Sequence, residues 1–276
     1  MSRNVGNVSK TTVDERIRTR SNLRSSNLDS PFHTICDMTN PIPTPLRLPD
    51  ILAQLQQHAR PDQLDGMARF GIVGAGRLGV SIPALRALAR SLGRDHALAL
   101  ALWDTAIPDA RILASMVSDP AQLTAHQMDQ WARDFNSWDV CDQTCLNAFV
   151  RSPLAWRKVP QWAKQSDEFV RRAAFALLAC LATHDKRAPD SAFIDALAWI
   201  EATARDERNF VKKAVNWALR GIGKRNAALR DAAIACALRI QQQGGKPARW
   251  IAADALRELH SEAVRQRQQR ATPITT

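Results

Sequence analysis

Two segments of this chain repeat one another at a regular interval. Residues 168–173 (EFVRRA) recur as residues 209–214 (NFVKKA), and a looser copy (ARWIA) begins at Ala248, after a further interval of similar length. A period of roughly 40 residues is typical of units built from a pair of helices. One such pair cannot bury its apolar face alone, so neighbouring pairs must stack into a solenoid with a concave surface.

The rest of the chain is consistent with stacked helices. From Leu48 to Ser261 apolar residues recur at spacings of three and four, Ala and Leu predominate, and alternating β-branched residues are absent. Turn signals at Gly93, 118–120, 152–153, 185–189 and 244–245 divide the segment into helices of about 10 to 18 residues. We therefore predict an all-α protein, a HEAT-like or armadillo-type solenoid, with one repeat domain over residues 46–262.

The two ends have a different composition. Residues 1–45 are rich in Ser, Arg, Asn and Thr, have no periodic apolar pattern, and end in a stretch with three prolines. This composition predicts a disordered N-terminal arm. An open alternative is that Met38 is the true start of the protein. We also predict a disordered C-terminal tail over residues 263–276.

The charge is strongly positive and unevenly placed. The formal net charge is +11, and residues 205–270 contain 15 Lys and Arg against 6 Asp and Glu. A one-sided excess of cations on folded helices attracts polyanions, which favours nucleic acid and places a DNA-binding face on the concave side of the solenoid. An acidic protein partner or a membrane surface is the remaining alternative.

Other composition features exclude several classes. The five cysteines show no CxxC spacing and no nearby histidine, so neither a metal site nor a disulfide framework is expected. Reduced thiols are typical of a cytoplasmic protein. No apolar run is long enough to cross a membrane and the N-terminus is polar, so we expect neither a membrane span nor a signal peptide. No cofactor is expected, and the protein is predicted to be a monomer.

One motif points towards a different fold. The segment from Phe70 to Gly79 contains G-x-G-x-x-G, and the acidic Asp104 follows downstream. A dinucleotide-binding fold would need a strand before the glycines and parallel strands after them. The run before the glycines is too short for that strand, and the segment from Leu98 to Trp103 has a helical pattern. We therefore reject an oxidoreductase.

Candidate functional residues lie on two helix faces. Trp138 and Asp142 are four residues apart and share one face, whereas Asp139 suits a helix N-terminus. A second face carries Lys213, Trp217, Arg220 and Lys224, with Arg172 at the corresponding place one repeat earlier. Cations around an indole suit phosphate and sugar contacts. The alternative for both faces is core packing with a solvated charged edge.

The sequence carries few catalytic groups. It has no Ser-His-Asp order, no paired catalytic carboxylates and no histidine cluster. One reaction requires few catalytic groups, because a purine alkylated at N3 or N7 is already cationic and leaves as a neutral base. The enzyme must then stabilise only the cationic sugar and orient a water molecule, and one carboxylate can do both.

An ordered series of motifs is similar to a known family. The motifs are residues 66–70 (GMARF), 79–83 (GVSIP), 102–104 (LWD), 138–142 (WDVCD), 172–174 (RAA) and 213–220 (KAVNWALR). Together they resemble the AlkD-like bacterial DNA alkylation-repair glycosylases, which are built from HEAT-like repeats. The resemblance covers residues 66–260 and implies base excision repair in the cytoplasm, close to the nucleoid.

The resemblance also implies residue roles. Trp138 and Trp217 correspond to aromatics that contact the deoxyribose of the lesion, Asp142 to the catalytic carboxylate, and Arg172 to a phosphate contact. In this family the lesion is not flipped into a pocket. Phe70, preceded by Arg69, falls at a DNA-contacting position where relatives can have Tyr. Ser137 replaces a second Trp that some members carry, and these two departures bear on the range of lesions.

Three functions remain in competition. The first is a glycosylase that acts on N3- and N7-alkylated purines in double-stranded DNA. The second is a non-catalytic repeat protein that binds damaged or branched DNA, which would not need Asp142. The third is a protein-binding scaffold, for which we would expect mixed charges on the concave face.

Overall fold

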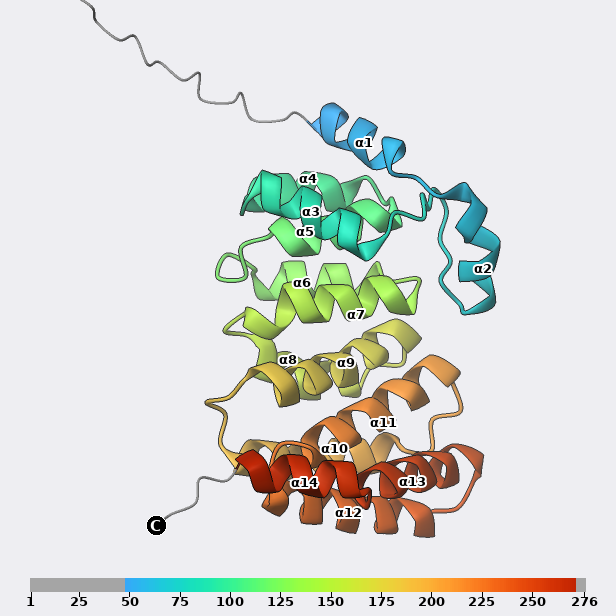
Figure 1. Ribbon diagram of the computed structural model, residues 1–276, viewed down its shortest axis with the longest axis vertical. Coiled ribbons are helices and arrows are strands. Elements are labelled where there is room, and N and C mark those ends of the chain that lie inside the picture. The colour runs from blue at the N-terminus through green and yellow to red at the C-terminus, as the bar shows by residue number, and fades with distance from the viewer. Residues whose placement is uncertain (1–47, 272–276) are drawn as a thin grey trace, which may run out of the picture. The chain divides into compact units, whose positions relative to one another are not determined.

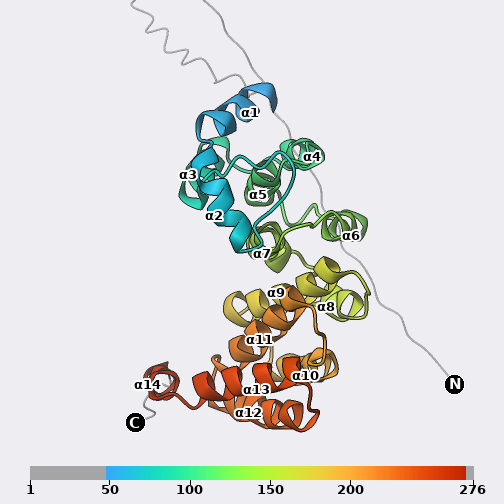
Figure 2. The same cartoon turned by 90° about the vertical axis from the view of Figure 1, so that its right-hand side faces the viewer.

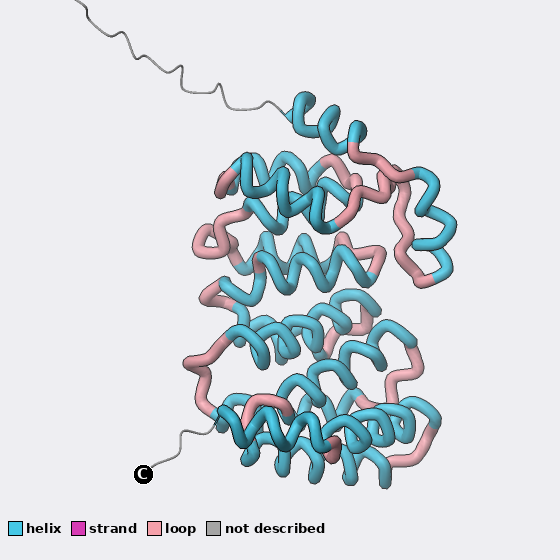
Figure 3. The backbone as a smooth tube through the Cα atoms, in the orientation of Figure 1, coloured by secondary structure: helices cyan, strands magenta, loops and turns pink. Residues whose placement is uncertain are grey.

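A computed structural model describes residues 48–271 of the chain (Figure 1). The predicted N-terminal arm, including Met38, lies outside the described residues, as do residues 272–276. The described part consists of helices and loops without a strand (Figure 3), so the all-α prediction is confirmed. The α-helices are α1 (Leu48–Gln57), α2 (Leu64–Arg69), α3 (Ile82–Leu92), α4 (His96–Asp104), α5 (Pro108–Val117), α6 (Ala125–Arg133), α7 (Trp138–Asn147), α8 (Ala155–Ala163), α9 (Glu168–His184), α10 (Asp190–Thr203), α11 (Asn209–Gly223), α12 (Ala227–Gln242), α13 (Lys246–Leu259) and α14 (Glu262–Ala271). Two short 3₁₀ segments are η1 (Pro61–Gln63) and η2 (Phe149–Arg151).

The helices of residues 48–271 stack in two ladders. One ladder runs α3, α5, α7, α9, α11, α13, and each of these helices contacts the next. We call it the inner ladder. The helices α4, α6, α8 and α10 lie on the other side of the stack, as Figure 2 shows, and α8, α10 and α12 contact one another in order. Each repeat therefore adds one helix to each ladder.

Small residues set the spacing within the inner ladder. All residues from Arg172 to Ala182 of α9 are buried, and five of them are alanines. Where α11 crosses α9, a Cβ atom placed on Gly221 would lie 3.5 Å from the Cβ of Ala182. The two helices therefore pack almost backbone to backbone, which places their exposed faces side by side.

Tryptophans connect successive repeats through hydrogen bonds to aspartates. The indole Nε1 of Trp103 donates to Asp134 at 2.8 Å, and that of Trp156 donates to Asp185 at 2.9 Å. Trp103 is buried and Trp156 is partly buried, so each indole N–H needs a partner, and in both cases an aspartate of the next repeat supplies it. These bonds fix the rotation of one helix pair against the next.

Side-chain caps begin several of the helices. Asp95, Thr124, Asp167 and Asn226 each accept a backbone N–H in the first turn of the helix that follows. Such side chains satisfy donors that the helix itself leaves unpaired. Asp95 and Thr124 begin helices shortly after the turn signals at Gly93 and residues 118–120, whereas Asp167 and Asn226 begin helices at turns that the sequence reading did not mark.

The predicted C-terminal boundary is wrong for residues 263–271. These residues belong to α14, in which the side chains of Val264 and Gln268 are buried. The Gln268 Nε2 donates to the carbonyls of Gly223, at 2.9 Å, and Asn226, at 3.0 Å. The strongly polar sequence of this helix hid the two residues that dock it.

No helix within residues 48–271 combines the length and the apolar character that a membrane crossing requires.

We predict that Phe175→Ala, in the middle of α9, lowers the free energy of unfolding by about 3–5 kcal/mol. The Phe175 side chain is fully buried, so its removal leaves a cavity between helices that already pack closely. Ile194→Ala is the control, because Ile194 is 49% exposed and its truncation should change stability by less than about 0.5 kcal/mol. Urea denaturation measures both, and equal losses would contradict the assignment of α9 as the centre of the core.

Candidate nucleic-acid interface

A buried ion pair joins α7 to α9. The Arg172 guanidinium donates from Nε to Asp142 Oδ1 at 3.0 Å and from Nη2 to Asp142 Oδ2 at 2.7 Å. Exposed fractions are 6% for the Arg172 side chain and 16% for that of Asp142. The two-point geometry orients the carboxylate and leaves a small part of it accessible.

Aromatic rings surround this ion pair. The guanidinium of Arg172 lies 5.8 Å from the ring centre of Trp138 and 6.0 Å from that of Phe210. Its Nη1 also donates to the carbonyl of Phe210 at 2.6 Å. The Phe210 ring stacks on that of Phe169 at 5.6 Å. We call Trp138, Asp142, Arg172 and Phe210 the α7–α9–α11 cluster.

Sequence reasoning used Phe210 as a marker of the repeat and missed it as a site residue. Phe169 and Phe210 occupy equivalent positions of successive repeats, and in a solenoid equivalent positions stack directly. The stacked pair could therefore have been inferred from the repeat interval. The contact between Phe210 and Arg172 could not, because it depends on the direction of a long side chain.

Burial raises the pKa of Asp142, and the charge and hydrogen bonds of Arg172 act against this rise. Burial also acts to lower the pKa of Arg172, but Asp142 outweighs it and raises this pKa. The guanidinium therefore stays protonated, and Asp142 loses its proton at a higher pH than an ordinary aspartate. The cluster holds a carboxylate whose charge is poorly solvated.

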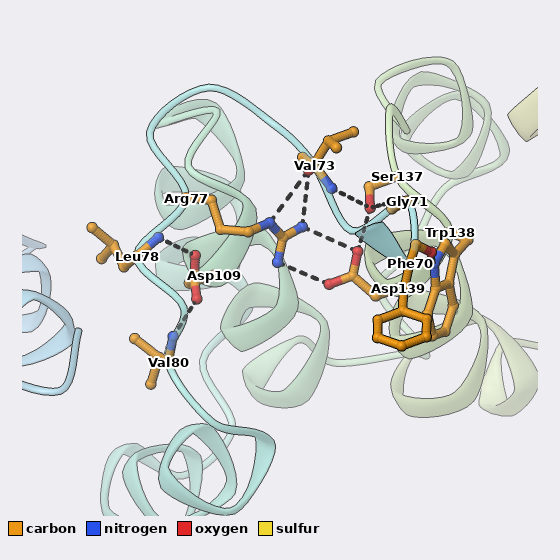
Figure 4. Close-up of polar contacts among 10 residues, drawn as sticks. All are labelled: Phe70, Gly71, Val73, Arg77, Leu78, Val80, Asp109, Ser137, Trp138 and Asp139. Carbon is orange, nitrogen blue, oxygen red and sulfur yellow. Dashed lines mark hydrogen bonds and ion pairs between the residues drawn. The ribbon is translucent and has the colours of Figure 1, made fainter. Parts of the chain in front are cut away.

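The glycine-rich loop between α2 and α3 covers the N-terminus of α7 (Figure 4). The Trp138 Nε1 donates to the carbonyl of Phe70 at 2.8 Å, which fixes the indole against this loop. The Phe70 side chain itself is 76% exposed, and Arg69 beside it is also exposed. Two residues predicted to contact DNA are thus free to do so, directly beside Trp138.

An ion pair beneath the loop holds it in place. The Arg77 guanidinium bonds both oxygens of Asp139, at 2.9 and 3.0 Å, and also donates to the carbonyl of Val73 (Figure 4). Ser137 donates to Asp139 and contacts the loop backbone at Gly71 and Val73. Ser137, which stands where some relatives have Trp, therefore helps to hold the loop, and Asp139 is the acidic partner in the ion pair that fixes it.

Gly71 is required by this arrangement. Its φ is +74°, and a Cβ there would lie 2.6 Å from Cζ of Phe210. Gly71 thus lets the loop pack on α11. The G-x-G-x-x-G sequence that follows it, Gly74 to Gly79, packs elsewhere: a Cβ on Gly74 would lie 2.7 Å from Cγ of Pro108, and one on Gly79 would lie 2.8 Å from the carbonyl oxygen of Arg60. With no strand among residues 48–271, the rejection of a dinucleotide fold is confirmed.

The predicted cationic stripe needs correction. Arg172 is buried in its pair with Asp142 and is not an open phosphate contact. Arg220 and Lys224 bond Glu258 at 2.6 and 2.7 Å, so their charges are largely compensated. Lys213 is exposed and forms no ion pair with any residue of the described range. A count of charges along the chain could not show these pairings, because Glu258 belongs to a different helix, α13.

Trp217 lies apart from the α7–α9–α11 cluster. Within residues 48–271 no hydrogen bond or ring contact joins it to the cluster, and it lines a separate cavity at the C-terminal end of α11. Trp138, Asp142 and Arg172 are thus brought together as the sequence suggested. The second predicted sugar contact is two helical turns beyond Phe210 on α11.

Comparisons with known proteins agree with the fold. The family described as "DNA alkylation repair enzyme" matches residues 51–259 of the chain. One similar solved structure has 18% sequence identity and a TM-score of 0.64, covering 70% of this chain and 83% of that chain. It comes from a new family of proteins related to the HEAT-like repeat DNA glycosylases, with affinity for branched DNA structures. The HEAT-like fold is therefore confirmed. No curated protein matches the chain.

We predict that Arg77→Met lowers the free energy of unfolding by about 3 kcal/mol, because it leaves the Asp139 carboxylate partly buried without its partner. The double variant Arg77→Met/Asp139→Asn should recover part of that loss, with a coupling energy of about 0.5–3 kcal/mol. Urea denaturation of the two single variants and the double variant measures this energy. Strict additivity would show that the ion pair does not anchor the loop.

Proposed function

Because the chain belongs to the family of DNA alkylation repair enzymes, we propose that it is a DNA glycosylase. Its substrate is duplex DNA containing a purine alkylated at N3 or N7, and it hydrolyses the bond between that base and deoxyribose without drawing the base into a pocket. The observation that carries this proposal is the position of Asp142, held by Arg172 beside the ring of Trp138.

The reaction makes only one strong demand on the protein. An N3- or N7-alkylated purine carries a positive charge, so breaking the glycosidic bond releases a neutral base and leaves the charge on the sugar. A fixed carboxylate stabilises the cationic sugar and accepts hydrogen bonds from the water that attacks it. Asp142 supplies this carboxylate, and its low exposure strengthens its interaction with a nearby cation.

The surrounding residues bind the DNA. Trp138 offers an aromatic face to the deoxyribose, and the exposed Phe70 lies on the loop that fixes the Trp138 indole. Arg69 and Lys213 are exposed cations for backbone phosphates. Arg172 is a positioning residue in this scheme, since its two hydrogen bonds fix the direction in which the Asp142 carboxylate points.

A second function is favoured by one observation. The similar solved structure belongs to a family with affinity for branched DNA structures, so a DNA-binding protein without base excision is the alternative. Binding and base-release assays on a lesion-containing duplex and a four-way junction distinguish the two proposals. A glycosylase releases base from a lesion-containing duplex, whereas a branched-DNA protein binds a four-way junction more tightly than that duplex and releases nothing.

We predict that Asp142→Asn lowers the single-turnover rate of N7-methylguanine release by about 10²–10³, while the dissociation constant for the duplex changes little. Asparagine keeps the size of the side chain and one acceptor for Arg172, but it removes the charge needed when the sugar becomes cationic. The assay uses saturating protein and a duplex with one N7-methylguanine, below the melting temperature of the variant.

Asp231→Asn is the matched control, because it removes one carboxylate from the exposed surface of α12, where Asp231 is 72% exposed. This control should release base at the rate of the unaltered protein. If Asp142→Asn does so too, the catalytic assignment fails, although the protein can still be a glycosylase that uses another group.

We predict that the rate of base release falls on the acid side of its pH profile. An ordinary aspartate has a pKa near 3.9, and the fall should occur at a higher pH than this value. Burial raises the pKa of Asp142, and only the deprotonated carboxylate stabilises the sugar, so activity is lost as pH falls through this raised pKa. The measurement is the single-turnover rate against pH, corrected for release from DNA without protein. An unchanged rate down to the ordinary pKa would contradict it.

A further inference from the structure

A separate cavity lies at the C-terminal ends of α9 and α11. Its volume is about 310 Å³, and Trp217 and Gly221 form part of its wall. The complete lining consists of Ala182, Thr183, Lys186, Trp217, Gly221, Lys224, Arg225, Arg267 and Gln268. Four of these residues are cations, and the lining contains no acidic residue of the described range.

The four cations are held in different ways. Arg225 is fixed in place, since its Nη1 donates to the carbonyl of Ala182 at 2.8 Å and its guanidinium lies 4.1 Å from the ring centre of Phe193. Lys224 shares Glu258 with Arg220. Lys186 and Arg267 are exposed and form no ion pair with residues 48–271. Arg225 also forms no ion pair within the described residues, but its guanidinium is held in place, so Lys186 and Arg267 are the two exposed cations of the cavity that are free of such contacts.

The helix α14 completes this cavity. Gln268 docks α14 on the end of α11 by bonding the carbonyls of Gly223 and Asn226, and Arg267 directly precedes it at the rim. The family match ends at residue 259, so α14 lies beyond the matched residues. Arg267 is an addition to the cationic surface that the family motifs do not include.

The cavity and the α7–α9–α11 cluster lie along the same helix, α11, with Trp217 in the wall of the cavity. Trp217 lies seven residues after Phe210 on α11, a distance of about 10 Å along the helix axis. A DNA strand that passes the cluster and continues along α11 would therefore reach the cavity within a few nucleotides. An indole beside cations suits a deoxyribose next to a phosphate.

We propose that this cavity binds an internucleotide phosphate of the DNA backbone, with Lys186 and Arg267 as its main contacts and Trp217 against the adjoining sugar. The proposal rests on the proposed function, because it extends the DNA-binding surface. Charge-assisted hydrogen bonds from several cations are the usual way in which proteins hold a phosphate. The cavity fixes the register of the strand relative to Asp142.

The test compares two double variants with the same net charge. Lys186→Ala/Arg267→Ala removes the two exposed cations of the cavity. Arg187→Ala/Arg270→Ala removes two exposed cations from the same loop and helix that lie outside the cavity lining and form no ion pair within the described residues. Fluorescence anisotropy with an undamaged, labelled duplex gives the dissociation constant of each protein over a series of salt concentrations from low to above physiological. Thermal melting confirms that all three proteins are folded.

We expect the cavity variant to lose one phosphate contact, so its log–log salt slope becomes shallower by about 0.9 and its affinity at physiological salt falls roughly fivefold. The control variant should keep the slope of the unaltered protein. Equal slopes and affinities for the two variants would overturn the proposal. Binding of undamaged DNA does not require base release, so a protein without glycosylase activity still tests this site.

Inorganic phosphate distinguishes a second source of the same ligand chemistry. Calorimetry with inorganic phosphate at millimolar concentration should show that the unaltered protein binds phosphate no more strongly than the cavity variant does. A different pair of results would overturn the DNA assignment. If the unaltered protein binds inorganic phosphate and the cavity variant does not, while the cavity variant and the control variant bind DNA equally well, the cavity is a site for a free anion. Failure of the unaltered protein to bind any duplex would overturn both this site and the proposed function.

Discussion

The guanidinium of Arg172 joins three successive helices of the inner ladder. It extends from α9, bonds the Asp142 carboxylate on α7, and donates to the Phe210 carbonyl at the start of α11. A buried guanidinium is stable only when its donors are satisfied, so these contacts depend on one another. The spacing of α7, α9 and α11 at their N-terminal ends therefore depends on one side chain, and with it the placement of the Trp138 ring.

The pairing also resolves an electrostatic conflict. A lone carboxylate in a DNA-binding groove repels the phosphate backbone, yet the proposed reaction needs a negative charge beside the sugar. Arg172 cancels the charge of Asp142 at long range, so the DNA meets a nearly neutral pair. A sugar bound next to Asp142 is close enough to interact with the carboxylate separately from the Arg172 guanidinium, and the carboxylate oxygens lie in a poorly solvated site. The attraction then grows when the sugar becomes cationic.

The sequence predicted the architecture because helix period, turn signals and the repeat interval all reported the same unit. It also predicted that Trp138 and Asp142 share a face, since that follows from helical geometry alone. It did not predict that Arg172 is buried, that Glu258 compensates Arg220 and Lys224, or that α14 is ordered. Each of these depends on contacts between different helices, far apart in the sequence, and the residue types alone do not encode them.

The same contacts change the meaning of the basic excess in the last quarter of the chain. Asp206 and Glu258 each accept two cations, so the most densely charged stretches are partly neutral once folded. What attracts a polyanion is the charge that remains uncompensated, and Lys213 on α11 together with the rim of the cavity at its end supplies part of it. A strand bound between them would follow α11 from Lys213 to the cations at its C-terminal end, which belong to the loop after α9 and to α14, with the intervening pairs rigid. Because the paired side chains between them are already fixed, DNA binding has to order only the few uncompensated cations, and the entropic penalty is limited to these.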